Sequence, residues 1–127
     1  MRGWPVLAAV AVGGAAGALL RYGLTTALPD RSGSYPWTIL AVNVAGCFLL
    51  ALLPGLAAVR RRPLLGPLLG PGVLGGFTTL SAYAEQSRAL VADGHDVLAA
   101  SYVVGTLAAC LLAVAAGARL VAEDGDP

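Results

Sequence analysis

The stretch GPLLGPGVLGGFTTLSAYAEQ, residues 66–86, decides the architecture of this chain. It lies inside an apolar segment long enough to span a membrane, yet it combines prolines, glycines and a cluster of hydroxyl side chains. A bilayer offers no hydrogen-bond partner to an unpaired backbone group, so such groups occur there only inside protein or beside a wet cavity. A span that interrupts its own helix therefore predicts a functional site.

Composition indicates that the whole chain lies in a membrane. Of its 127 residues, 57% are hydrophobic and only 12% are charged, too few to give a soluble domain a polar surface. At about 20 residues per spanning helix, this length holds about four helices with short loops. The net charge of +1 gives no indication of a nucleic-acid partner. We expect one all-α membrane domain over residues 1–127.

Four apolar segments follow one another along the chain, and polar or arginine-containing loops separate them. The expected spans are residues 4–28, 37–59, 64–91 and 96–120. An even number of crossings puts both termini on one side. More of the arginines lie on that side, which favours a multi-pass protein of the inner cell membrane with its termini inside.

Small residues recur at helical spacing in two spans. Gly13 and Gly17 form a GxxxG pair, and a small residue stands at every fourth position from 105 to 117. Such stripes predict close helix–helix contacts. Four helices are few for enclosing a pore, which favours an assembly of two or more chains. Cys47 and Cys110 also fall inside spans, where we expect the thiols to pack as small apolar groups, with a disulfide as the alternative.

Polar side chains inside the spans are candidates for function, because they are costly at membrane depth. Arg21 lies late in the first span and Asn43 lies in the second. Polar residues at spacings of three or four follow in the third span, namely Thr78, Ser81, Glu85 and Arg88. Each has an ordinary alternative, since arginines can snorkel to headgroups and Asn43 can join two helices. Their alignment nevertheless favours a polar track for ions.

An interruption near residues 75–79 has an electrical consequence. It leaves carbonyl groups at the end of the first half-helix and amide donors at the start of the second. One motif can then hold a cation and favour an anion nearby. Close packing of glycines is the alternative explanation for the glycine cluster.

Three stretches in order resemble the signature sequences of the CrcB, or Fluc, fluoride channels, and the resemblance covers essentially the whole chain. They are GGAAGALLRYGL at 13–24, NVAGCFLL at 43–50 and GGFTTLSAYAE at 75–85. The resemblance implies a passive fluoride-selective channel that exports toxic cytoplasmic fluoride. It also implies an antiparallel, dual-topology dimer with two pores, a broken third transmembrane helix and a central structural sodium ion.

The resemblance assigns individual residues to the pore. Asn43 matches the family's pore asparagine, and Arg21 and Ser81 match further polar positions. Tyr102 and Thr106 fall where the family has a pore-lining tyrosine and a hydroxyl residue.

The same resemblance places the sodium ion on backbone oxygens. The carbonyls of Gly75 and Thr78, taken from both subunits, would hold it. Oxygen ligands suit a hard cation, and here the backbone supplies them without a carboxylate.

Two positions depart from the family pattern. Leu80 and Tyr83 stand where the family has a pair of phenylalanines whose ring edges face the anion, and Leu80 offers no such edge. The family glutamate that follows would align with Gln86, whereas the acid here is one residue earlier at Glu85, so either residue can be its equivalent. These departures motivate the hypothesis that the partner is either a second copy or a paralogous subunit of a heterodimeric fluoride channel.

Two other classes of protein fit the composition. A small four-helix proton-coupled cation or drug exporter needs a carboxylate deep in the membrane, and Glu85 is the one acidic residue well inside a span. A subunit without transport would use the polar stripe for packing. An enzyme is not indicated, since the lone His95 lies in a predicted loop without a set of metal ligands. The arginines at 60–62 favour contact with anionic membrane lipid.

Overall fold

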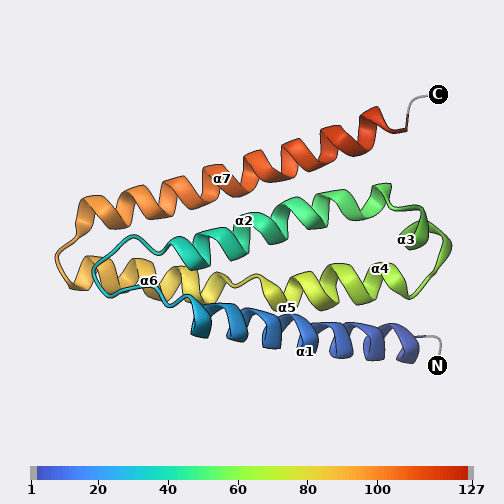
Figure 1. Cartoon of the computed structure of the whole chain (residues 1–127), viewed down its shortest axis with the longest axis horizontal. Coiled ribbons are helices and arrows are strands. Elements are labelled where there is room, and N and C mark those ends of the chain that lie inside the picture. Colours follow the sequence, from blue (N-terminus) through green and yellow to red (C-terminus); the bar gives the residue numbers. More distant parts are fainter. Residues whose placement is uncertain (1–2, 126–127) are drawn as a thin grey trace.

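The computed structural model describes residues 3–125, and every regular element in that range is helical. The chain runs along the long axis of the molecule four times, and the described segment begins and ends at the same end of the molecule (Figure 1). The first, second and fourth passes are α1 (Trp4–Ala27), α2 (Trp37–Leu52) and α7 (Asp96–Glu123). The third pass consists of several shorter elements.

Within residues 3–125, three helical stretches are long and apolar enough to cross a membrane. They are Trp4–Ala27, Trp37–Gly55 and Asp96–Glu123. The third pass is not among them, because no single helix in it is long enough.

The second pass ends earlier than residue 59, the expected end of that span. Here α2 stops at Leu52, and a 3₁₀ turn, η1 (Leu53–Gly55), leads to the short helix α3 (Ala57–Arg61). Pro54 explains the change, because proline has no amide hydrogen to continue the α-helical pattern. The guanidinium of Arg60 donates to the carbonyls of Pro54 and Gly55 at 3.1 and 2.7 Å, so it closes this helix end.

The third pass contains the predicted interruption. It begins with α4 (Leu65–Pro67), a π-helix η2 (Leu68–Leu74) and α5 (Gly75–Phe77). Thr78 and Thr79 are then extended, with ψ angles of 156° and 114°, before α6 (Leu80–Ala92) begins. The break is narrower than the expected 75–79, since Gly75 and Gly76 remain helical. The π-helix includes Pro71, which cannot donate a helical hydrogen bond.

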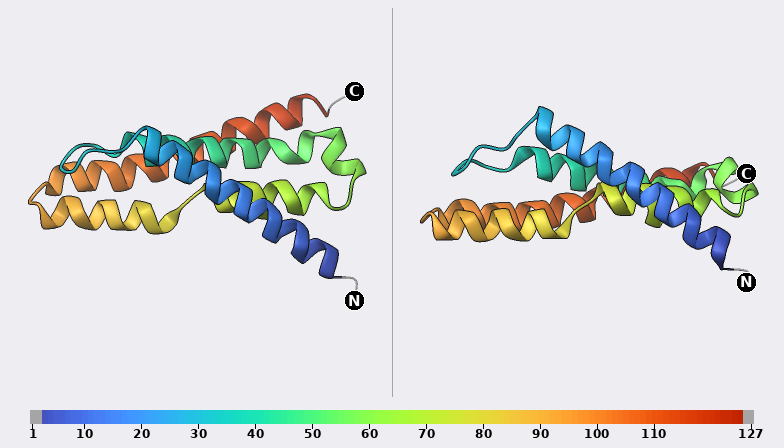
Figure 2. Two further views of the ribbon diagram at one scale, coloured as in Figure 1. Left: turned by 60° about the horizontal axis from the view of Figure 1, so that its bottom comes forward. Right: turned by 90° about the horizontal axis from the view of Figure 1, so that it is seen from below.

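Helix α1 crosses the third pass at its broken centre, packing against η2 and α5 (Figure 2). The close approach requires glycine on both sides. A Cβ added to Gly13 would lie 2.9 Å from the amide nitrogen of Val73, and one added to Gly17 would lie 2.9 Å from that of Phe77. Gly76 in turn meets the backbone of Gly14. The contact predicted from the GxxxG pair is confirmed.

On the other side of the molecule, α7 packs along α2 and α6. The small-residue stripe of α7 lies at this contact, where a Cβ on Gly117 would lie 2.8 Å from that of Ala51. Towards the other end of α7, Leu90, Ala99 and the fully buried Tyr102 form a small core. Most other large apolar side chains of α1 and α7 are exposed, as expected of helices that face lipid.

Candidate functional site

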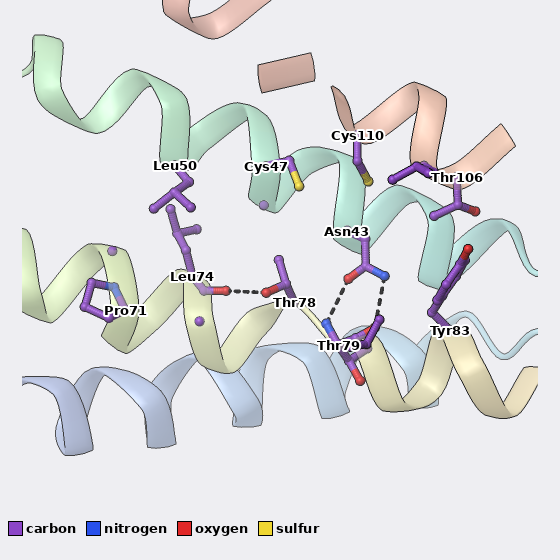
Figure 3. Close-up of a pocket in the computed structure, with 15 residues that line it drawn as sticks. Asn43, Cys47, Leu50, Pro71, Leu74, Thr78, Thr79, Tyr83, Thr106 and Cys110 are labelled. Carbon is purple, nitrogen blue, oxygen red and sulfur yellow. Dashed lines mark hydrogen bonds between the residues drawn. The ribbon is translucent and has the colours of Figure 1, made fainter. Parts of the chain in front are cut away.

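The extended residue Thr79 is held by a side chain from another pass. The Nδ2 atom of Asn43 on α2 donates to the Thr79 carbonyl at 3.1 Å, and the Thr79 amide donates to Oδ1 of Asn43 at 2.8 Å (Figure 3). Asn43 is only 8% exposed. One buried amide side chain therefore provides both backbone partners that the interrupted helix lacks.

The Thr79 side chain caps the second half-helix. Its Oγ1 accepts a hydrogen bond from the Ala82 amide at 3.1 Å and lies 3.1 Å from Oγ of Ser81. This is a threonine N-cap, a common way to satisfy the first amides of a helix. The sequence predicts free amide donors at the start of the second half-helix. The structure corrects this expectation in part, because the Ala82 amide is bonded within the chain.

Arg21 binds the end of the first half-helix. Its Nη1 donates to the carbonyls of Gly76 and Thr78, both at 2.9 Å. These carbonyls are the partial negative pole of the half-helix, so the positive guanidinium lies where the dipole favours it. Arg21 therefore reaches the break itself and does not extend along α1 towards headgroups.

Two carbonyls at the break are released from helical hydrogen bonding. In a continuous helix the Thr79 amide would donate to the Gly75 carbonyl, and the Ala82 amide to that of Thr78. These amides instead donate to Asn43 and to the Thr79 side chain. Gly75 is exposed at the surface of the chain. The break therefore presents backbone oxygens of the kind that a hard cation binds.

A groove of about 530 Å³ runs along the break, between α2, the third pass and α7 (Figure 3). Its polar lining is made by Asn43, Thr78, Thr79, Tyr83 and Thr106. Leucines and the two cysteines make up much of the rest. All five of these polar residues come from the predicted site or its break, so the fold brings together residues that are far apart in the sequence.

Thr106 is a polar side chain of the groove whose hydroxyl has no hydrogen-bond partner in the described part of the chain. It is 4% exposed, and its Oγ1 has no partner among residues 3–125. A buried hydroxyl without a partner is costly, so Thr106 is a candidate for a functional role in the groove wall.

Tyr102 does not line this groove. Its side chain is fully buried, and its hydroxyl donates to Oε1 of Gln86 at 3.3 Å. Nε2 of Gln86 in turn donates to Oδ2 of Asp30 at 3.4 Å. Gln86 therefore faces the interior, whereas its neighbour Glu85 is exposed.

Asp30 is a structural residue that the sequence interpretation missed. Its carboxylate accepts hydrogen bonds from the amides of Thr38 and Ile39, at 2.9 and 3.2 Å, at the start of α2. An acidic residue shortly before an apolar helix is the signal that could have identified it. Asp30 also lines a second cavity, of about 360 Å³, together with Arg21 and Gln86.

The remaining predicted residues on α6 lie in different environments. Leu80 lines the groove and is 78% exposed, whereas the Tyr83 hydroxyl donates to the Val103 carbonyl at 2.9 Å. Glu85 pairs with Arg88 at 2.7 Å on the exposed surface. Within the single chain, Thr78 is partly buried, whereas Ser81, Glu85 and Arg88 are exposed, and α6 carries no buried carboxylate.

Comparison with known proteins gives a consistent match. The family model described as CrcB-like protein, Camphor Resistance (CrcB), matches residues 8–118.

Three curated relatives are each named as a fluoride-specific ion channel. FluC 2 of Thermobifida fusca is 45% identical over 123 residues, which cover 94% of this chain and 90% of that protein. FluC 2 of Nocardia farcinica is 44% identical over 115 residues, covering 88% and 81%. FluC 1 of Streptomyces coelicolor is 42% identical over 119 residues, covering 88% and 77%.

Proposed function

The chain belongs to the CrcB-like family, and from this membership we propose that it is a fluoride-selective channel through which cytoplasmic fluoride leaves the cell passively. The relatives named as fluoride-specific channels support the choice of ion. The apolar helices and these relatives make the chain a multi-pass membrane protein, and its family is one of ion channels, not of enzymes. The observation that carries the proposal is the groove beside the break, with the unpartnered Thr106 hydroxyl in its wall.

Fluoride is a small and strongly hydrated anion, so its path must replace water with hydrogen-bond donors. The Thr106 hydroxyl is one donor. The Asn43 amide has two N–H groups, of which one is used by the Thr79 carbonyl, so the second is another donor. Neither group carries a full positive charge that would trap the ion. Leu80 and Leu107 provide apolar walls. These walls cannot replace the hydration of an anion that is too large to approach the donors closely.

We propose that a second chain of opposite orientation closes the groove and creates two pores in the dimer. Leu80 and Leu107 line the groove and are 78% and 59% exposed. The polar groups beside these leucines are costly in contact with lipid, because acyl chains offer them no hydrogen bond. We therefore favour a protein partner, and not acyl chains, as the cover of this groove. The partner is a copy of this chain or a paralogous subunit. The absence of an aromatic ring at Leu80 is the feature that favours a paralogue.

We further propose that sodium is held where the two chains meet. The Gly75 and Thr78 carbonyls fit this role, because neither accepts the amide hydrogen bond of a continuous helix. The Thr78 carbonyl already accepts one hydrogen bond from Arg21. A carbonyl oxygen has two lone pairs, so the second remains available to a cation. Two oxygens from one chain leave a hard cation short of the roughly six that such ions take, so both subunits would contribute. The bound ion would supply a fixed positive charge between the pores.

The proposed function is tested with liposomes that contain the purified chain alone and a mixture of fluoride and chloride salts. When a potassium ionophore removes the electrical limit on anion efflux, fluoride should leave and chloride should stay. Comparable loss of both ions, or efflux that requires a proton gradient, would contradict the proposal. Efflux that appears only after a paralogous chain is added would identify the heterodimer.

A further inference from the structure

Cys47 on α2 and Cys110 on α7 are neighbours across the contact between these two helices (Figure 3). Both thiols are free, both are partly buried, and both line the groove. The helices that carry them are regular at these positions and pack along each other. Two thiols are therefore presented together on rigid elements, with open space in front of them.

We propose that Cys47 and Cys110 form a binding site for a soft divalent cation that accepts two-coordinate geometry, of which the mercuric ion is the type. Thiolates are the ligands that soft metal ions select. Zinc does not fit, because it takes about four protein ligands in a structural site. No group of three or more histidine, cysteine or acidic side chains that could hold a metal occurs within residues 3–125.

Charge favours a divalent ion at this place. Binding removes one proton from each thiol and forms two metal–sulfur bonds, so two thiolates and one divalent cation give a neutral complex. The groove is mainly apolar, and a neutral complex costs less there than a charged one. The carbonyls at the break are hard oxygen donors and do not compete for such an ion.

Binding has a structural consequence. The ion would join α2 to α7 along the wall of the groove. Because the two thiols are held together only in the folded chain, the ion should stabilise the fold as well as occupy the site. This inference does not depend on the proposed transport function.

The test uses the purified full-length chain in detergent, titrated with mercuric ion alone to measure stoichiometry and, in a separate titration, with a competing monothiol in excess to measure affinity. We expect one ion per chain, loss of two titratable thiols per ion and a higher melting temperature. Cys47→Ser and Cys110→Ser should each weaken binding by at least about 100-fold, because a single thiolate loses the advantage of a preorganised second ligand.

Two results would overturn the inference. One is a single-cysteine variant that retains mercuric ion as tightly as the parent chain in the same competition. The other is a parent chain in which each ion consumes one thiol, a result that needs no variant and so does not depend on how the variants fold. The double variant serves as the control for binding elsewhere.

Discussion

Three side chains hold the interruption of the third pass in place. Asn43 pairs with both backbone groups of Thr79, Arg21 binds the carbonyls of Gly76 and Thr78, and Thr79 caps α6. Each provides a partner that a continuous helix would have provided through its own backbone. The donors and oxygens proposed for ion binding are therefore positioned by contacts between α1, α2 and the break.

Replacing Asn43 by aspartate should damage both the fold and the pathway. The substitution removes the donor to the Thr79 carbonyl and puts a carboxylate oxygen against it. We expect a loss of about 1–3 kcal/mol of stability, together with loss of fluoride efflux. Thermal unfolding in detergent and liposome efflux measure the two effects. Ser101→Ala is the matched control, since that exposed hydroxyl donates only within its own helix, and efflux of the Asn43→Asp chain at the parent rate would contradict the role of Asn43.

Replacing Arg21 by methionine should loosen the break. The change keeps an unbranched, flexible side chain but removes the guanidinium, so it leaves the Gly76 and Thr78 carbonyls without their donor. A hydrogen bond to a charged group contributes about 1.5–3 kcal/mol, so the melting temperature should fall clearly. Arg119→Met, on the exposed surface of α7, is the control and should have little effect. If the two variants melt at the same temperature, Arg21 does not hold the break.

These contacts mark the limit of what the sequence predicts. Proline, glycine and threonine within a few residues of one another predict an interruption, because their effect on a helix is local. The partners of the interruption are not local, since Asn43 is 36 residues from Thr79 and Arg21 is 57 residues from Thr78. No periodicity reveals such pairs. The resemblance to a family named Asn43 and Arg21 but did not indicate what either side chain contacts.

At the level of helices, the third pass is built from two halves that need different neighbours. The first half lies against α1 through glycine, and the second half packs against α7. The GxxxG pair predicts the contact of the first half with α1, and the small stripe of α7 predicts the contact of α7 with α2, because small residues at helical spacing allow close backbone approach. The π-helix η2 and the early end of α2 were not predicted, since each depends on how one proline is accommodated.

Alanine substitutions on α1 test the glycine contact. Gly17→Ala would place a methyl group against the carbonyl of Val73, a backbone atom that cannot turn aside. We expect the variant to be strongly destabilised, because the added methyl group would push α1 away from the third pass. Gly23→Ala is a matched control on the same helix, because nothing lies within 4 Å of its added Cβ. It should be neutral or more stable by about 0.5–1 kcal/mol.

The measurement is thermal unfolding of both variants under identical conditions. Equal stability of Gly17→Ala and Gly23→Ala would show that the helices are not in contact at this point. A lower stability of Gly23→Ala alone would place the contact face of α1 on its other side.

For the molecule as a whole, the single chain would be incomplete as the proposed channel. Its groove is open along one side, and two carbonyls alone cannot surround a sodium ion. The sequence could indicate this only indirectly, through the small number of helices and the resemblance. Tyr102 illustrates the same limit at the site, because its fully buried position depends on the packing of three helices around it and not on its spacing from Thr106.

A stable dimer that depends on sodium is the expectation at this scale. The purified chain should have the mass of two chains in detergent, and replacing sodium by a large organic cation should lower the melting temperature, because an ion that binds only the folded dimer stabilises it. Light scattering and thermal unfolding measure the two effects. A single-chain mass at concentrations that support efflux would contradict the dimer, and an unchanged melting temperature would contradict the sodium site.

The central claim is that fluoride passes along the groove beside the break, and the most direct test is the fluoride efflux rate of Thr106→Val. The Thr106 hydroxyl has no partner among the described residues, so its removal should leave the melting temperature unchanged or raise it. Loss of one donor to the ion, about 1.4 kcal/mol, predicts a fluoride efflux at least about tenfold slower. A folded Thr106→Val chain that releases fluoride at the parent rate would contradict the claim.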